Sequence, residues 1–224
     1  VYKRQDGKSF KKFLPYGYGE QRPIVLSPST LSLERHRLLW LWLKHETEFF
    51  SAPLKVLLMA PAQCFLDVFK SMKNLDYLTA DLFSPIVDVK ANILELPFED
   101  NSFIVIFCNH VLEHIEDDSK AMSELYRVMR PGGMGIFQVP QDLGREKTYE
   151  DFSITDPEER ARQFGQYDHV RVYGKDYFSR LRKAGFRVEE IEYAKTLDEQ
   201  TSDRYRLNPK EILPVCYKET DMTS

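Results

Sequence analysis

The sequence predicts an α/β fold, a Rossmann-like, doubly wound, mostly parallel seven-stranded sheet preceded by an N-terminal helical lead. Short apolar runs alternate with helical patterns from residue 55 onward. Residues 103–108 are continuously apolar, as expected for a strand buried on both faces. A helical pattern and a second apolar run at 135–139 follow, which is the order of a right-handed β-α-β crossover.

Length and composition indicate one soluble domain of ordinary size. The chain has 224 residues, of which 42% are hydrophobic and 29% charged, with a net charge of −4. The scattered basic residues weigh against a nucleic-acid surface, and no apolar segment reaches the ~20 residues of a membrane span. We see no signal peptide and expect a cytoplasmic protein, in which Cys64, Cys108 and Cys216 are buried, reduced thiols.

The first residues, Val-Tyr-Lys-Arg-Gln, read like a translated transposon adapter. We therefore expect residues 1–5 to be a sequencing scar on a truncated gene fragment, and a longer genomic read would test this. We expect residues 1–50 to form a lead segment with a helix, and residues 51–219 to form the main domain. A polar insertion at 141–166 is expected to act as a lid or substrate loop.

The lead helix is expected to begin at Ser32, whose hydroxyl can cap it. One face of this helix is predicted to be buried by Leu33, Leu38, Leu41 and Trp42. The opposite face is predicted to carry Glu34, Arg35, Arg37 and Lys44 into water. The cluster Arg35-His36-Arg37 is interpreted as part of this solvated face, and contact with an anion is the alternative.

Seven strands are expected at 55–59, 75–80, 87–93, 103–108, 135–139, 186–194 and 212–217. Pro131-Gly132-Gly133 is expected to end the helix before the fifth strand. A short helix is expected from Thr155, and another at 173–184, closed by Gly185. Pro214 predicts an edge position or a bulge for the last strand, because proline cannot donate to a sheet ladder.

The helix after the fourth strand has a clear apolar face, with Ala121, Leu125, Val128 and Met129 at helical spacing. Residues 117–119 supply candidate N-caps and negative charge for its positive end. In open α/β sheets, ligands bind beyond the carboxyl ends of the strands. Asn109, His110 and Glu113 follow the fourth strand and should lie there.

Three segments carry a family resemblance: LPFEDNSF at 96–103, NHVLEHI at 109–115 and RVMRPGG at 127–133. Their order and spacing resemble the class I S-adenosylmethionine-dependent methyltransferases, and more closely the broad type 11, ubiquinone-biosynthesis-like group. The resemblance covers roughly residues 54–193. It implies S-adenosylmethionine as cofactor and a small molecule or a lipid or sugar intermediate as methyl acceptor.

The loop after the first strand departs from this pattern. The family usually has a glycine-rich loop there, whereas residues 58–63 are Leu-Met-Ala-Pro-Ala-Gln. The chain resembles a bacterial subgroup with a glycine-free first loop. The resemblance then implies that Ala60 and Pro61 lie against the methionine part of the cofactor, with one N–H donor fewer because of Pro61.

The resemblance also implies the remaining cofactor contacts. Asp81, at the end of the second strand, would accept both ribose hydroxyls, and an ionised carboxylate has the two oxygens that this needs. Asn92 would accept the adenine amino group, and Ile93 would pack on the ring. Asn109 and His110 would lie near the methionine part and the reaction centre.

Methyl transfer is an in-line displacement that mainly requires positioning, and a base is needed only if the acceptor loses a proton. His169 and His110 are the candidate catalytic residues. We expect His114 to pack or to cap a helix, and we expect no metal site. The alternative function is a catalytically inactive binding or scaffold protein. The sequence contains neither a dinucleotide fingerprint nor a P-loop. It leaves the methyl acceptor and the oligomeric state open.

Overall fold

The computed structural model describes residues 2–3, 9–10, 12–17 and 22–220. The chain forms two compact units, each built from several segments. The first unit comprises residues 1–53, 62–75 and 191–213, and the second comprises residues 54–61, 76–190 and 214–224. The boundary predicted at residue 50, between the lead segment and the main domain, stays a prediction. Of the suspected scar, residues 1, 4 and 5 lie outside the described residues, and β1 (Tyr2–Lys3) pairs antiparallel with β2 (Ser9–Phe10).

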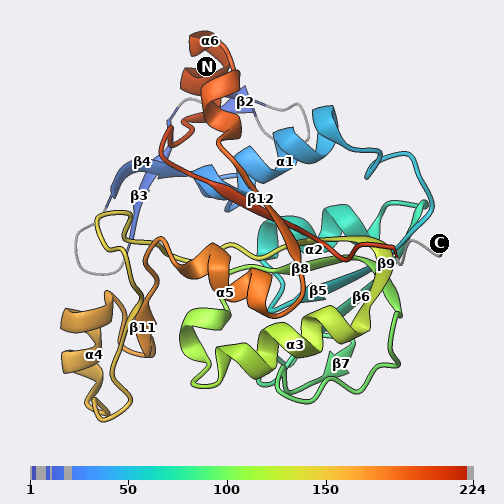
Figure 1. Ribbon diagram of the computed structural model, residues 1–224. Coiled ribbons are helices and arrows are strands. Elements are labelled where there is room, and N and C mark those ends of the chain that lie inside the picture. The colour runs from blue at the N-terminus through green and yellow to red at the C-terminus, as the bar shows by residue number, and fades with distance from the viewer. Residues whose placement is uncertain (1, 4–8, 11, 18–21, 221–224) are drawn as a thin grey trace. The chain divides into compact units, whose positions relative to one another are not determined.

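A seven-stranded sheet has the strand order β12-β13-β9-β8-β5-β6-β7 (Figure 1). Its strands are β5 (Leu54–Met59), β6 (Leu75–Asp81), β7 (Val89–Lys90), β8 (Phe103–Cys108), β9 (Met129–Ile136), β12 (Arg187–Ile191) and β13 (Leu213–Tyr217). The pairs β5–β8, β8–β9 and β6–β7 are parallel, and β13 is antiparallel to β9. This confirms the predicted seven-stranded, mostly parallel sheet.

The crossover from β8 to β9 is confirmed in outline. β8 pairs with β5 on one side and β9 on the other, and Ile106 at its centre is fully buried. The connecting helix α3 (Asp118–Val128) begins at Asp117, whose carboxylate accepts a hydrogen bond from the Lys120 N–H at 2.9 Å. The predicted apolar face of this helix has no exposed surface: Ala121, Leu125, Val128 and Met129.

The boundary between α3 and β9 differs from the prediction. The helix ends at Val128, and Met129 is already extended, with φ −75° and ψ 136°. Arg130 precedes a proline, which disfavours helical dihedrals at that residue. Pro131-Gly132-Gly133 therefore lies inside β9, and the strand ends at Ile136 and not at residue 139. The third strand is also shorter than predicted, because only Val89–Lys90 pairs with β6.

The prediction for Pro214 is wrong. β13 lies between β12 and β9, and its register against β9 runs without a shift from Val215 to Tyr217. Pro214 has no N–H, but its carbonyl oxygen accepts from the Phe137 N–H at 3.5 Å. A proline at the start of the paired stretch is thus tolerated inside the sheet.

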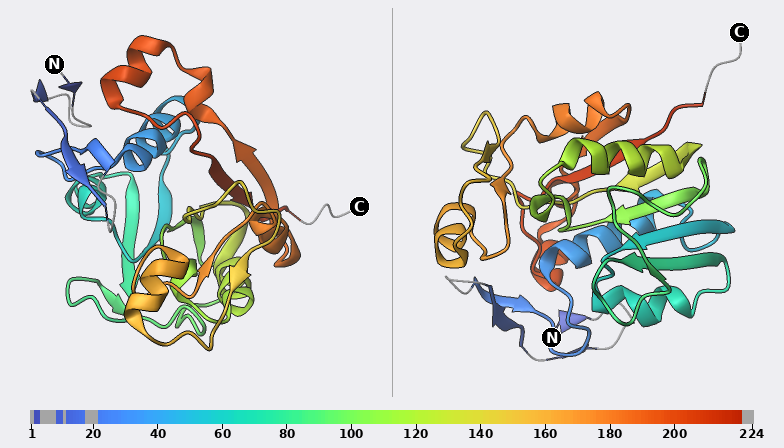
Figure 2. Two further views of the ribbon diagram at one scale, coloured as in Figure 1. Left: turned by 90° about the vertical axis from the view of Figure 1, so that its left-hand side faces the viewer. Right: turned by 90° about the horizontal axis from the view of Figure 1, so that it is seen from below.

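The segment after β9 contains short elements at one end of the second unit (Figure 2). β10 (Tyr149–Glu150) and α4 (Pro157–Phe164) lie in the predicted insertion at 141–166, and β11 (Arg171–Val172) and α5 (Tyr177–Lys183) follow it. The predicted short helix is confirmed as α4, capped by the carboxylate of Asp156, which accepts from the Glu159 N–H. α5 starts at Tyr177 and not at residue 173, because residues 171–172 pair with β10.

The first unit contains β3 (Leu14–Tyr16), β4 (Arg22–Leu26), α1 (Glu34–Glu46), α2 (Gln63–Lys70), a 3₁₀ turn at Tyr193–Thr196 and α6 (Glu199–Tyr205). α1 and α2 pack through aromatic rings, among them Trp40 and Phe69 at 6.4 Å between centroids. α1 begins after Leu33 and not at Ser32, and the Leu33 N–H donates to His36 Nδ1.

The predicted solvated face of α1 is wrong at Glu34 and Arg37, which are both buried. Arg37 donates hydrogen bonds to the carbonyl oxygens of Val25, Ser32 and Tyr205. Val25 is in β4 and Tyr205 ends α6, so two of the partners lie in other elements, and the helical pattern of α1 does not reveal them. Burial lowers the pKa of Arg37 to about 9.

Cys64, Cys108 and Cys216 are free and buried, as predicted. Within the described part of the chain, no helix has the length and apolar character needed to cross a membrane.

Arg127 on α3 offers a test of how the segment before β8 is held. Its guanidinium donates to the carbonyl oxygens of Leu96 and Phe98 at 2.9 and 2.7 Å and pairs with Glu124 at 2.8 Å. We expect Arg127→Met to lower the free energy of unfolding by roughly 2–3 kcal/mol, because these acceptors lose a charged donor. Urea denaturation measures this value.

Arg130→Met is the matched control, because among the residues that the structure describes Arg130 donates only to the Asn101 carbonyl oxygen, at an exposed position. It should change stability by less than about 0.5 kcal/mol. Equal losses in the two variants would contradict the assigned role of Arg127.

Candidate functional site

The predicted cofactor residues lie at the carboxyl ends of β5 to β8, in the second unit. Ala60 follows β5 with φ +43°, a left-handed conformation that L-residues rarely adopt and that glycine adopts freely. Its N–H donates to the Ala80 carbonyl oxygen on β6 at 2.9 Å. The loop thus keeps the backbone geometry of a glycine position although it contains an alanine.

Asp81 ends β6 and shapes the turn that follows. Its Oδ1 accepts from the backbone N–H groups of Phe83 and Ser84 at 2.7 and 2.6 Å. No hydrogen bond to its Oδ2 occurs within the residues that the structure describes. One oxygen therefore fixes the carboxylate, and the other can accept from a ligand.

Asn92 and Ile93 follow β7. The Ala91 N–H donates to the Asp81 carbonyl oxygen at 3.1 Å, which keeps the ends of β6 and β7 together. Asn92 is exposed, and its Oδ1 accepts from the Leu94 N–H at 3.0 Å. Ile93 is only 4% exposed, so its side chain supports this loop from the core.

Asn109 and His110 join the end of β8 to the segment after β9. The Gln138 N–H donates to Asn109 Oδ1 at 2.9 Å, and the His110 N–H donates to the Gln138 carbonyl oxygen at 2.7 Å. His110 has φ +58°, a second left-handed residue at this edge of the sheet. This geometry directs the chain from β8 into the turn that carries Glu113.

Glu113 is the centre of a buried polar cluster. Its Oε1 lies 3.2 Å from His110 Nδ1, and its side chain is almost fully buried. Burial by itself raises the pKa of Glu113, but the hydrogen bond from His110 and the charges of His110 and His114 outweigh burial. The net pKa lies below the ordinary value, so Glu113 is ionised at neutral pH.

His114 and His169 complete this cluster, their ring centroids 4.8 Å apart at an interplanar angle of 78°. His169 is 7% exposed, and burial lowers its pKa. The structure therefore brings together both predicted catalytic histidines, His110 and His169, with Glu113 between them. His114 packs against His169, as expected, and it also lies close to Glu113, which the sequence did not suggest.

Sequence reasoning missed the network that holds this cluster. Arg171, 1% exposed, donates to the carbonyl oxygens of Leu112 and Glu116 at 3.0 and 2.8 Å and to Glu150 at 2.9 Å. Arg180 on α5 extends the network by pairing with Glu150 at 2.7 Å and with Asp118 at 2.6 Å. The signal was the alternation Val170-Arg171-Val172, which indicates a short strand with arginine on its own face.

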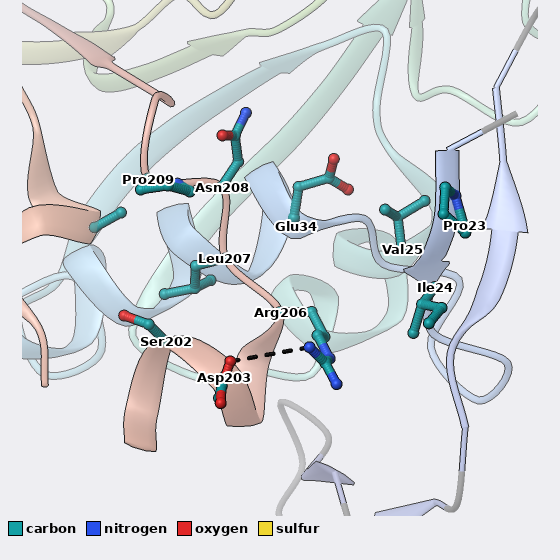
Figure 3. Close-up of a pocket in the computed structure, with 11 residues that line it drawn as sticks. Pro23, Ile24, Val25, Glu34, Ser202, Asp203, Arg206, Leu207, Asn208 and Pro209 are labelled. Atoms are coloured by element: carbon teal, nitrogen blue, oxygen red, sulfur yellow. Dashed lines mark ion pairs between the residues drawn. The ribbon is translucent and has the colours of Figure 1, made fainter. Parts of the chain in front are cut away.

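The first unit has a separate cavity of about 510 Å³ (Figure 3). Its lining consists of residues 23–25 of β4, Glu34 of α1, Ala194 and residues 202–203 and 206–209. Glu34 forms a salt bridge with Arg22, and Asp203 Oδ1 lies 3.9 Å from Arg206 Nη1. None of the site residues predicted from the sequence lines this cavity.

The left-handed Ala60 can be tested through stability. We expect Ala60→Gly to raise the free energy of unfolding by roughly 0.5–1 kcal/mol, because glycine adopts φ +43° without steric cost. Thermal denaturation followed by circular dichroism measures the change.

Ala80→Gly is the control, because Ala80 is a buried residue inside β6. It should destabilise the protein by about 0.5–1 kcal/mol or more. Destabilisation of similar size by Ala60→Gly would contradict the strained geometry.

A family model described as a methyltransferase domain matches residues 59–137. A probable S-adenosylmethionine-dependent methyltransferase of Mycolicibacterium smegmatis is 34% identical over 88 residues, which are 37% of this chain and 34% of that protein. The 27-O-demethylrifamycin SV methyltransferase of Amycolatopsis mediterranei is 32% identical over 117 residues, 50% of this chain and 40% of that protein. The chain thus matches well under two thirds of these relatives.

Solved structures share the fold at low identity. An S-adenosylmethionine-dependent methyltransferase from Mesorhizobium loti has a TM-score of 0.54 and 16% identity, covering 80% of this chain and 97% of that one. The [4+2]-cyclase SpnF has a TM-score of 0.55 and 14% identity, covering 92% and 89%. The three sequence segments, the matching family model and the seven-stranded sheet agree. Residues 59–137 therefore match a methyltransferase domain, and the chain has the fold of the class I S-adenosylmethionine-dependent methyltransferases.

Proposed function

We propose that this protein transfers a methyl group from S-adenosylmethionine to a small-molecule acceptor. The observation that carries the proposal is the geometry of Asp81. Its carboxylate ends β6, is fixed through Oδ1 by two backbone N–H groups, and keeps Oδ2 for a ligand. A charged acceptor that is already oriented binds neutral hydroxyl donors well.

The other residues at this edge fit the same cofactor. Asn92 lies on the loop that the Ala91 N–H ties to the end of β6, close enough to Asp81 for one nucleoside to reach both. Its Oδ1 already accepts one hydrogen bond, and a second lone pair remains for the adenine amino group. Ala60 and Pro61 form the loop after β5, where the left-handed turn at Ala60 lets the backbone approach a ligand.

When bound, S-adenosylmethionine would supply a methyl group that is already activated by a sulfonium. The residues of this chain would hold the two reactants in line and exclude water. Asn109 contributes a fixed turn at the end of β8, because its side chain is bonded to the Gln138 N–H. The assignment of His110 and His169 as proton acceptors stays a prediction, as do the cytoplasmic location and an acceptor other than nucleic acid.

The acceptor class is part of the proposal. Relatives that this chain resembles over 28–40% of their length include a ubiquinone/menaquinone biosynthesis C-methyltransferase of Psychromonas ingrahamii and the rifamycin enzyme named above. These names support quinone-like and other ring-containing hydroxylated molecules as the first acceptors to screen.

An inactive binding or scaffold protein is the second candidate, and one observation favours it. The first loop has no glycine, and Pro61 removes an N–H that would face the cofactor. The same fold also occurs in SpnF, named as a [4+2]-cyclase, so fold alone does not fix the reaction.

Calorimetric titration with S-adenosylmethionine and with S-adenosylhomocysteine separates the two candidates. We expect micromolar binding of both by the purified chain. In Asp81→Asn, the retained Oδ1 still caps the turn, but the new amide nitrogen cannot accept from a ribose hydroxyl. Binding should weaken at least about tenfold.

Asp76→Asn makes the same change of charge at an exposed position at the other end of β6. It should bind like the parent chain. Unchanged affinity in Asp81→Asn would remove the ribose assignment, and a folded parent chain that binds neither molecule at millimolar concentration would favour the scaffold function.

A further inference from the structure

We propose that Glu113, His114 and His169 form a binding site for one divalent transition-metal ion, with Zn²⁺ as the best match. The sequence did not suggest such a site, because an adjacent Glu-His pair and a distant histidine match no common ligand spacing. The site does not depend on the proposed methyl transfer, and it uses residues outside the predicted nucleoside contacts.

The three side chains converge in the structure. One ligand atom from each lies within 4.8 Å of the others. An ion at the centre of a triangle with sides of that length is about 2.8 Å from each corner, and zinc–nitrogen bonds are about 2.0–2.1 Å long. Each ligand atom thus needs to move inward by roughly 0.7 Å at most, which small side-chain rotations allow.

Both imidazoles are oriented as metal ligands usually are. His169 Nδ1 lies 3.1 Å from the Phe164 carbonyl oxygen. His114 Nδ1 lies 3.3 Å from the Asp168 carbonyl oxygen and 3.4 Å from its carboxylate. Because these oxygens accept, each Nδ1 carries a proton, and the neutral form of each imidazole then has its lone pair on Nε2. Metal-binding histidines typically donate their second N–H to such a carbonyl or carboxylate.

Glu113 supplies the third ligand, and one of its carboxylate oxygens is buried without a hydrogen-bond donor among the described residues. Its Oε1 accepts from His110, whereas its Oε2 is buried and has no hydrogen-bond partner among the residues that the structure describes. A buried carboxylate oxygen without a partner is costly, and native structures nearly always satisfy it. A cation bound between Glu113 and the two imidazoles would satisfy it.

The backbone around the cluster is fixed from both sides. The Val170 N–H donates to the Glu113 carbonyl oxygen at 3.0 Å, and Arg171 binds the carbonyl oxygens of Leu112 and Glu116. The ligands are therefore held before an ion arrives, which lowers the entropic cost of binding. His114, with 27% of its side chain exposed, is the ligand nearest to solvent and marks the route of entry.

The ligand set selects the ion. Two imidazoles and one carboxylate are the set of open zinc sites and of some iron(II) sites, whereas Mg²⁺ and Ca²⁺ prefer oxygen ligands. Three protein ligands leave at least one position for water or substrate. Metal binding would occupy His169 Nε2, so His169 could not also accept a proton from a methyl acceptor.

The test is calorimetry on the full chain without a histidine tag, first treated with chelator and dialysed. ZnCl₂ should bind with a stoichiometry of one and MgCl₂ should not bind. Co²⁺ should give the visible absorption of a four- or five-coordinate ion. His114→Gln and His169→Gln should each weaken Zn²⁺ binding at least about 100-fold.

His45→Gln is the control, because His45 contacts Tyr193 in the first unit and lies outside the cluster. It should bind Zn²⁺ like the parent chain. Because Glu113 is buried, His114→Gln is the decisive variant, with its fold checked by circular dichroism. Absence of stoichiometric Zn²⁺ binding, or equal binding in folded His114→Gln, overturns the site and leaves His169 Nε2 free.

The same samples keep this inference separate from the proposed function. Asp81→Asn should retain Zn²⁺ while its affinity for S-adenosylmethionine falls. His114→Gln should lose Zn²⁺ while keeping S-adenosylmethionine. Loss of both ligands in both folded variants would contradict the assignment of two separate sites.

Discussion

The buried guanidinium of Arg171 is the group on which the arrangement of the second unit depends. It binds the carbonyl oxygens of the turn after β8 and the carboxylate of Glu150 on β10. A buried arginine is tolerated only when its donors are satisfied and its charge is paired. Both conditions are met only if the insertion folds back onto the residues that follow β8, so one side chain joins two distant parts of the sequence.

Much of the fold follows from local pattern. Residues 103–108 were predictable as a buried strand, because a short, continuous apolar run bounded by polar residues fits a strand that is covered on both faces. α3 was equally clear from its apolar spacing and from Asp117. The errors occurred where a long-range partner decided the outcome. Pro131 lies inside β9 where its register against β8 shifts, and Pro214 lies inside the sheet, where its carbonyl oxygen accepts from the Phe137 N–H.

The site was predictable only in part. Asn109 could be located because it follows a strand, and the ends of parallel strands share one edge, whereas Asp81 and Asn92 were assigned through the family resemblance. The burial of Arg37 and Arg171 could not be read from the sequence, because most of their partners are backbone carbonyl oxygens of other segments, and any residue type supplies such an oxygen. Nor could the sequence indicate that Glu113 and His169 meet, because an insertion with no repeating pattern brings them together.

The bonds made by Arg171 also have a dynamic consequence. Proteins unfold locally in cooperative segments, and we expect segments that are joined by buried hydrogen bonds to open together. The carbonyl oxygens of Leu112 and Glu116 are bonded to Arg171 on β11, so the turn after β8 and the strand that follows the insertion should open together, although they are far apart in sequence. Amide protons on the two segments would then exchange with solvent at matched free energies. Opening of the insertion and of the strand that follows it would then determine the lifetime of the ordered turn after β8.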